Sequence, residues 1–206
     1  MRTYTEKRSP RLFDDETGLE RIIFFSDAVF AIAITLLALE IRLPSLPEGA
    51  GNGQLLAALG ALWPRYLSYA ISFLAIGLMW MAHHHAFRHV HQYDRRLMFL
   101  NLLFLMAIGF LPFPTAVIGE FGNAVGTIFY AAAMATAGLL LALLWRYVRA
   151  EGHFLWTPVI FLLSIPLALV SPDAAKYAWL LILIPALWHP AATGQRNHRF
   201  HRWHRF

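Results

Sequence analysis

The chain has 206 residues, of which 58% are hydrophobic and only 14% are charged, and its mean hydropathy is +0.52. A soluble core does not need so much apolar surface, so the composition predicts a membrane protein with several spans. The net charge of +5 comes from cations in short segments between apolar runs, a pattern typical of topology signals rather than of a nucleic-acid interface. The chain has no cysteine, which excludes disulfides and thiolate metal sites.

Residues 1–19 are polar and charged, and we expect them to form a solvated cytoplasmic N-terminal tail. This stretch lacks the apolar core of a signal peptide. The apolar run that follows is too long for one and has no small-residue cleavage pattern after it. A cleavable signal peptide is therefore not expected.

The first apolar run, residues 21–43, is long enough to cross a bilayer and contains no glycine or proline. It carries Ser26 and Asp27 near its start. An ionised carboxylate is costly in lipid unless it faces other helices or water. Asp27 therefore predicts a polar interior at this depth.

The same run has an aliphatic stripe. Because a helix turns about 100° per residue, Ile32, Leu36 and Leu39 fall on one narrow stripe. Thr35 lies about 60° to the side of this stripe, and Asp27 points roughly 140° away from it. We expect the helix to have two different interior faces, one aliphatic with a threonine and one polar. From the pattern alone, the aliphatic stripe indicates core packing.

Five further apolar runs follow. The second is interrupted near Pro64, which predicts a short surface helix and then a spanning helix from Arg65. The third has prolines near its far end, and the last two are short. The six runs predict an all-α polytopic membrane protein with six transmembrane helices in residues 20–190 and a basic cytoplasmic tail, 191–206. The later runs are 55–87, 97–118, 124–147, 156–170 and 175–188.

The positive charges predict the orientation. An even number of spans places both termini on one side of the membrane. Of the 17 Lys and Arg residues, only Arg42, Arg65 and Lys176 lie in or beside the loops after spans one, three and five. The others lie in the termini and in the loops after spans two and four. Because cytoplasmic segments carry the excess of Lys and Arg, both termini are predicted to be cytoplasmic.

Polar residues of three spans are expected to meet at one level of the membrane. Ser26 and Asp27 lie in the cytoplasmic half of span one, near His83–His85 at the end of span two and Asn101 of span three. We expect a hydrogen-bonded network that holds span one, in which a histidine donates to Asp27. Arg21 does not share a helix face with Asp27, so it needs a partner on another helix. An ion site or proton relay at Asp27 is the functional alternative.

Five histidines lie between His83 and His91. Consecutive histidines on a helix point about 100° apart, so they do not converge on one ion. We expect interfacial or packing histidines and no metal site. The chain also lacks a Gly-rich phosphate loop, a nucleophile elbow and a nucleic-acid motif, so no catalytic residue, cofactor or nucleic-acid partner is predicted.

The head of the first span carries a recognisable motif. Arg21, Phe25, Ser26 and Asp27 spell RxxxFSD, and AVFAIAITLLALEI, WMAHHHAF and NLLFLMAIGFLPF follow in spans one to three. With these segments, residues 1–120 resemble the transmembrane protein 175 family, the endolysosomal potassium channels and their shorter prokaryotic relatives. A single copy of the motif resembles the prokaryotic type, which implies a homotetramer in a prokaryotic plasma membrane.

The resemblance implies a channel that conducts potassium passively, with a modest preference over sodium, through a pore lined by the first helix of each subunit. It places the constriction at Ile32, with Leu36 and Leu39 as further layers, and selectivity at Thr35. A narrow ring of Ile32 dewets, and it passes ions when it dilates. The motif network is implied to hold the pore helix rather than to conduct, and it comprises Arg21, Phe25, Ser26, Asp27, His83, His84 and Asn101.

Two other functions stay open from the residues alone. A proton-coupled or secondary ion transporter would use Asp27 and the His83–His85 cluster, and its flux would saturate and follow a gradient. A membrane enzyme with haem or metal on histidine ligands would be coloured or would contain stoichiometric metal.

Overall fold

The computed structural model describes residues 16–88, 90, 93–150 and 156–182. This part of the chain is helical and contains no strand, which confirms the predicted all-α class. The expected tail 191–206 and residues 1–15 lie outside it, and the first helix begins four residues inside the predicted N-terminal tail. The helices are α1 (Glu16–Leu39), α2 (Asn52–Ala61), α3 (Trp63–Phe87), α4 (Arg95–Phe110), α5 (Pro112–Glu120), α6 (Ala124–Val148), α7 (Trp156–Val170), α8 (Pro172–Ala178) and the 3-10 helix η1 (Trp179–Ile182).

Four helical segments are long and apolar enough to cross a membrane, and they correspond to the first four predicted spans. The predicted break before the second span is confirmed, because α2 ends at Ala61 and Pro64 lies in the first turn of α3. The third span consists of α4 and α5, which are separated at Leu111 just before Pro112. Proline has no backbone N–H, so it fits the first turn of a new helix better than a helix interior.

The two last predicted spans are short in the described chain. The 15 residues of α7 are about 22 Å long, less than the roughly 30 Å of a bilayer core. Ser171 ends this helix and caps α8, because its hydroxyl accepts a hydrogen bond from the Ala174 N–H. The predicted sixth span begins in α8 and η1, and its remainder from residue 183 lies outside the described residues.

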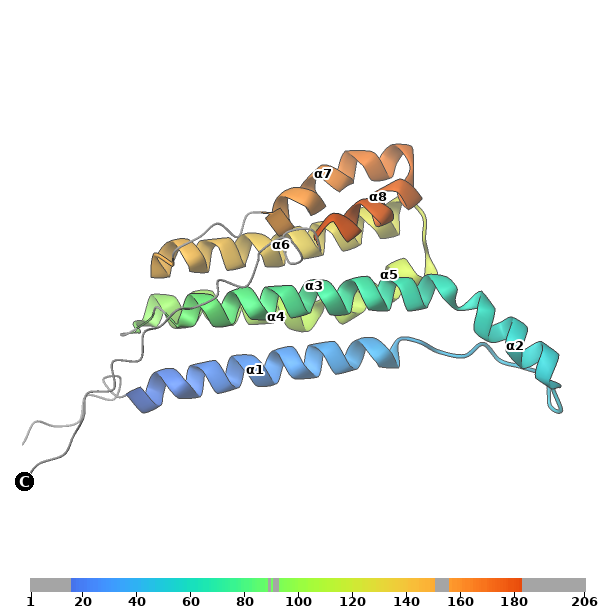
Figure 1. Cartoon of the computed structure of the whole chain (residues 1–206), viewed down its shortest axis with the longest axis horizontal. Helices are drawn as coiled ribbons and strands as arrows, with labels where there is room; N and C mark the ends of the chain where they lie inside the picture. Colours follow the sequence, from blue (N-terminus) through green and yellow to red (C-terminus); the bar gives the residue numbers. More distant parts are fainter. Residues whose placement is uncertain (1–15, 89, 91–92, 151–155, 183–206) are drawn as a thin grey trace, which may run out of the picture.

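The bundle has three layers, shown in Figure 1. Helix α1 lies at one edge and packs against α3, α4 and α5, which form the middle layer. Helix α6 packs on the other side of that layer, and α7 and α8 cover α6. The α6–α7 contact is close, because a Cβ on Gly138 would lie only 2.9 Å from Pro158. Small residues let membrane helices approach in this way.

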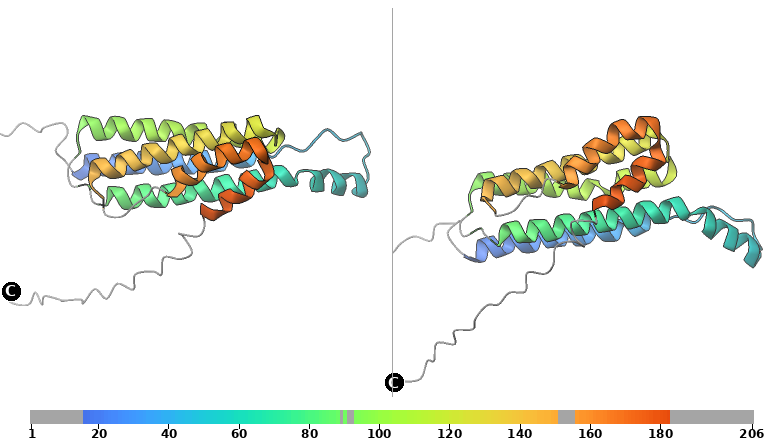
Figure 2. Two further views of the ribbon diagram at one scale, coloured as in Figure 1. Left: turned by 90° about the horizontal axis from the view of Figure 1, so that it is seen from above. Right: turned by 45° about the horizontal axis from the view of Figure 1, so that its top comes forward.

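The two ends of the bundle differ. We call the end that holds His83, the start of α4 and the end of α6 the histidine end, and the opposite end the α2 end. Helix α2 projects beyond the other helices there, as Figures 1 and 2 show, and none of its residues is buried. Arg65 at the start of α3 donates to the carbonyl oxygen of Arg42 at 2.8 Å and lies 3.8 Å from Glu120. It thereby ties the loop after α1 to α3 and α5.

Candidate functional site

One face of α1 is covered by the middle layer. Its buried residues are Ser26, Phe30, Ala33 and Leu37, which recur every three or four positions. That spacing places all four on one side of a helix. Phe30 contacts the rings of His83 and Phe104, with centroids 5.8 and 5.7 Å apart, so this face meets both α3 and α4.

The opposite face of α1 is open in the subunit. Ile32, Thr35 and Leu39 each follow a buried residue by two positions, which is about 200° around the helix. Ile32 is 58% exposed and Leu39 is 67% exposed. Leu36 directly precedes the buried Leu37, so it lies on the flank and is 40% exposed. The sequence placed Thr35 to the side of the stripe that contains Leu36, whereas the structure places Thr35 nearer the centre of the open face.

Thr35 presents an oxygen on this open face. Its hydroxyl donates to the carbonyl oxygen of Ile32 at 2.8 Å. A threonine hydroxyl has one proton and two lone pairs, so the lone pairs remain available once the proton is used. The side chain can therefore accept from water or coordinate a cation.

Asn101 joins three helices at the histidine end. Its Nδ2 donates to Ser26 Oγ at 3.0 Å, and its Oδ1 lies 2.8 Å from His83 Nε2. Ser26 Oγ in turn donates to the carbonyl oxygen of Ile22 at 2.8 Å. Because an amide oxygen only accepts, His83 Nε2 carries the proton. Ser26, His83 and Asn101 are all buried, so this network links α1 to α4 and α3 inside the bundle.

Aromatic rings hold the His83 imidazole. It stacks on Phe87 with centroids 4.3 Å apart and on Phe104 at 5.5 Å. The ring therefore has apolar neighbours on its faces and one directed hydrogen bond at its edge. This surrounding fixes the orientation of the imidazole toward Asn101.

Asp27 has a different partner from the predicted one. Its Oδ1 accepts from the Trp80 Nε1–H at 2.8 Å, where the sequence predicted a histidine donor. Trp80 lies on α3, one turn before His84, in the segment WMAHHHAF that carries the family resemblance, but the sequence contains no signal that pairs this tryptophan with Asp27. His84 is exposed, with its ring 5.9 Å from that of Trp80. Asp27 and Trp80 form a second link between α1 and α3, outside the buried network.

Arg21 and Phe25 lie beside this network rather than in it. Both side chains are exposed, and they line a cavity of about 350 Å³ that Tyr93, Met98 and Asn101 also border. Within the described residues, Arg21 makes no ion pair. Gly18 lies at the same place, where the Tyr93 hydroxyl occupies the position that a Cβ would need.

The remaining histidine of the described cluster, His85, stacks on Trp145 with centroids 5.6 Å apart. His89 and His91 lie outside the described residues. Within the part of the chain that the structure covers, no three His, Asp or Glu side chains come together as metal ligands. Packing of α3 against α6 is the role that this geometry supports for His85.

Comparison with known proteins identifies the family. The family model described as endosomal/lysosomal potassium channel TMEM175 matches residues 21–112. A protein named potassium channel from Streptomyces collinus is 45% identical over 144 residues, which are 68% of this chain and 68% of that protein. The chain belongs to the TMEM175 family. The resemblance drawn from RxxxFSD is thereby confirmed, and the chain is a multi-pass membrane protein of an ion-channel family.

Other members of the TMEM175 family match over different lengths. A potassium channel from Chamaesiphon minutus is 40% identical over 148 residues, 68% of this chain and 70% of that one. The human endosomal/lysosomal proton channel TMEM175 is 44% identical over 98 residues, 45% of this chain and 19% of the human protein. The crystal structure of a lysosomal potassium-selective channel TMEM175 homolog from Chamaesiphon minutus superposes with a TM-score of 0.76 at 32% identity. It covers 84% of this chain and 98% of that chain.

Proposed function

We propose that this protein is a potassium channel that conducts passively and prefers potassium modestly over sodium. The relatives from Streptomyces collinus and Chamaesiphon minutus bear the name potassium channel, and the matched crystal structure is titled potassium-selective. The fold described here covers nearly the whole of that channel chain. An ion channel catalyses no covalent step, which accords with the proposal that the chain has no catalytic residue and no cofactor other than the permeant potassium ion.

The observation that carries the proposal is the open face of α1. An edge helix that presents Ile32, Thr35 and Leu39 away from its own bundle needs either lipid or other copies of the chain against it. Acyl chains cannot bind the lone pairs of the Thr35 oxygen, whereas water and cations in an ion path can. We therefore place four copies around one axis, with α1 of each subunit lining the pore.

In this arrangement, Ile32 forms the narrowest ring. Four isoleucine side chains exclude water when the ring is narrow and admit ions when it dilates slightly. Leu36 and Leu39 form further layers toward the α2 end, with Leu36 contributing from the flank.

Selectivity is assigned to Thr35. Its lone pairs face the pore beside the apolar rings, because its proton is bonded to the Ile32 carbonyl oxygen. Potassium loses its hydration shell at lower cost than sodium, so a tight apolar ring flanked by threonine oxygens favours potassium without a cage of carbonyls. The preference is modest because few oxygens replace the water that the ion loses.

The motif network positions the pore helix in this proposal. Ser26, His83 and Asn101 act from inside the bundle, and Asp27 acts through Trp80. Arg21, Phe25 and His84 border these contacts from the exposed side. All seven predicted motif residues are therefore assigned to holding α1 rather than to conducting ions.

The placement in the membrane follows from the charge pattern. We propose six spans within residues 20–190, with the histidine end and both tails, 1–19 and 191–206, on the cytoplasmic side. The channel then lies in the plasma membrane of a prokaryote as a homotetramer, with the bilayer as its surroundings.

Ion flux from liposomes tests this function. Purified protein is reconstituted, and potassium and sodium gradients are compared while a proton ionophore clamps the pH difference. We expect rapid flux that does not saturate, with potassium faster than sodium. Because the human relative is named a proton channel, the same vesicles are assayed for proton flux without the ionophore. Potassium flux that is absent, or that requires a proton gradient, would contradict the passive potassium channel.

A further inference from the structure

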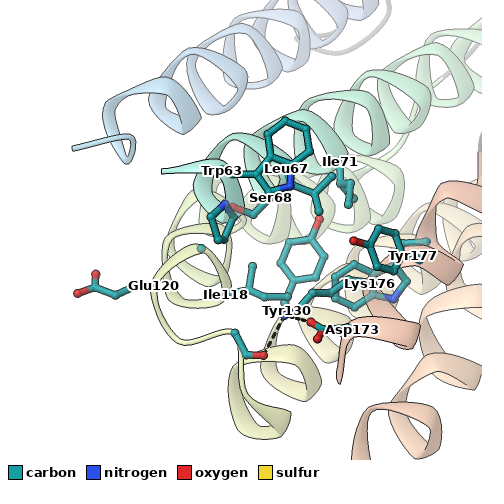
Figure 3. A pocket seen from close by; sticks show the side chains of 14 residues that line it. Trp63, Leu67, Ser68, Ile71, Ile118, Glu120, Tyr130, Asp173, Lys176 and Tyr177 are labelled. Carbon is teal, nitrogen blue, oxygen red and sulfur yellow. Dashed lines mark hydrogen bonds and ion pairs between the residues drawn. The ribbon is translucent and has the colours of Figure 1, made fainter. Parts of the chain in front are cut away.

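A cavity at the α2 end, shown in Figure 3, lies outside the proposed pore. It has a volume of about 330 Å³ and lies between α3, the link from α5 to α6, and α8. The middle layer separates it from α1, so it belongs to the opposite side of the subunit from the open face. Its lining combines an apolar floor with a charged rim.

The floor of the cavity is apolar although it contains two polar ring side chains. Leu67, Ile71 and Ile118 supply aliphatic wall. Tyr130 and Trp179 are buried, with ring centroids 4.7 Å apart. The Tyr130 hydroxyl lies 2.9 Å from Ser72 Oγ, and Trp179 Nε1 donates to Ser164 Oγ at 2.8 Å. Their polar atoms are therefore already bonded elsewhere, so a hydrocarbon chain fits this floor better than a polar solute.

The rim carries the ammonium of Lys176, which has more N–H donors than bonded acceptors. Lys176 Nζ donates to the Gly122 carbonyl oxygen at 2.9 Å and to Asp173 Oδ1 at 3.0 Å. An ammonium has three N–H groups, so one remains without a partner among the described residues. The Lys176 side chain is only 18% exposed, whereas that of Asp173 is 80% exposed. Glu120 points away from the cavity in Figure 3. Lys176 is thus the most enclosed charged side chain of the rim, which Asp173 and Glu120 also line.

The cavity also lies at the level of the lipid headgroups. Trp63 begins one membrane-spanning segment and Glu120 ends another, and both line the cavity. Trp63 and Tyr177, which are exposed at this rim, are the residue types that gather at membrane interfaces. An apolar chamber below the interface and a cation at the interface match the two parts of a lipid.

We propose that this cavity binds a membrane phospholipid, with its phosphate on Lys176 and one acyl chain against Leu67, Ile71 and Trp179. The lipid fills the space between α3 and α8 and braces the outer layer of the bundle against the middle layer. This site requires only the membrane location of the chain and is independent of which ion the pore conducts.

Native mass spectrometry with phosphatidylglycerol tests the site on the full-length protein in detergent. We expect about one lipid retained per subunit. Lys176→Met removes the phosphate partner and should weaken retention roughly tenfold or more, as expected for a charged hydrogen bond. Arg42→Met removes the same charge from the same end of the bundle, outside the cavity, and should leave retention unchanged. Asp173→Asn removes the carboxylate that competes for Lys176 and should strengthen retention.

A second variant separates the cavity from the charge. Leu67→Trp fills the chamber while Lys176 stays in place, so it should also lose the lipid. Equal retention by the wild-type chain, Lys176→Met and Leu67→Trp would overturn the proposal. Competition by glycerol phosphate as effective as by phosphatidylglycerol would also overturn it, because the chamber would then contribute nothing. None of these readouts involves ion flux, so a failure here is distinguishable from a failure of the proposed channel function.

Discussion

The two faces of α1 differ in whether their side chains are covered by partners in the same subunit. The covered face is complete within one subunit, because Ser26 and Phe30 are buried and their partners on α3 and α4 are identified. The open face leaves Ile32, Thr35 and Leu39 exposed among the described residues of the subunit. One helix therefore has a side that determines its position and a side that is free to serve a function. Substitutions on the covered face should change folding, whereas those on the open face should change conduction.

The largest effect is expected at Asn101. Asn101→Leu leaves the buried His83 N–H without an acceptor, which should lower the free energy of unfolding by about 1–3 kcal/mol. Thermal unfolding in detergent measures the loss. Adding His83→Phe removes the His83 N–H that has lost its acceptor and keeps an aromatic ring between Phe87 and Phe104. The double variant should therefore recover most of the stability. A double variant no better than Asn101→Leu alone would count against the hydrogen bond as the cause.

A smaller loss is expected where Asp27 meets Trp80. Trp80→Phe keeps a ring but removes the N–H that Asp27 accepts, so tetramer recovered by size-exclusion chromatography should fall. A hydrogen bond to a charged group contributes about 1.5–3 kcal/mol, and less at this partly exposed pair. Trp63→Phe is the control, because Trp63 is an exposed tryptophan at the opposite end of the same helix. Asp27→Ala should show the same loss, and an assembled Asp27→Ala tetramer with altered selectivity would move Asp27 into the conduction path.

Ile32→Asn tests the open face directly. A polar ring at the constriction stays hydrated, so potassium flux should rise severalfold. The unfolding temperature should change little, because the Ile32 side chain is mostly exposed in the described subunit. Flux that does not change would remove Ile32 as the gate, and destabilisation equal to that of Asn101→Leu would erase the difference between the two faces.

Leu39 has a matched control on another helix. Leu39 and Leu163 of α7 are the same residue type and are both 67% exposed in the subunit. Leu39→Ala should increase flux by widening an outer layer of the pore, whereas Leu163→Ala should leave it as in the wild type. Equal effects from the two variants would mean that exposure alone, rather than a place on the pore, accounts for the response.

The smallest effect is expected at Thr35. Thr35→Ala removes the hydroxyl oxygen and should lower the ratio of potassium to sodium permeability, measured from reversal potentials. Thr35→Ser keeps the oxygen and should keep the ratio. An unaltered ratio in Thr35→Ala would take this residue out of the selectivity mechanism.

Much of the architecture was predictable because it depends on local properties. Hydropathy over about 20 residues identified the four long spans, and proline chemistry identified the break before α3. Helical periodicity predicted that α1 has two distinct faces. The levels of Ser26, His83 and Asn101 followed from the topology, so their meeting was expected. These inferences need only the chain's own sequence and the thickness of a bilayer.

Other features depended on how the helices pack sideways. The choice of Trp80 over a histidine as the donor to Asp27, and the flank position of Leu36, follow from the rotation of α1 against α3 and α4. Ser72, Thr115 and Tyr130 form a buried cluster, in which the Ser72 oxygen lies 2.9 Å from the hydroxyl oxygen of Tyr130 and 2.9 Å from that of Thr115. Nothing in the sequence predicted this cluster. Nor did anything in it predict the cavity beside Lys176, which is bordered by segments more than 100 residues apart.

The sequence by itself therefore determined the membrane class, the four long spans and the motif that marks the family. Only the tertiary structure decided which side of α1 is covered, which donor reaches Asp27 and where a cavity remains between α3 and α8. The physical reason is that hydropathy and helical period are properties of a single segment. Hydrogen-bond partners and cavities between helices depend on the rotation and depth of each helix relative to its neighbours, and many distant contacts set these together.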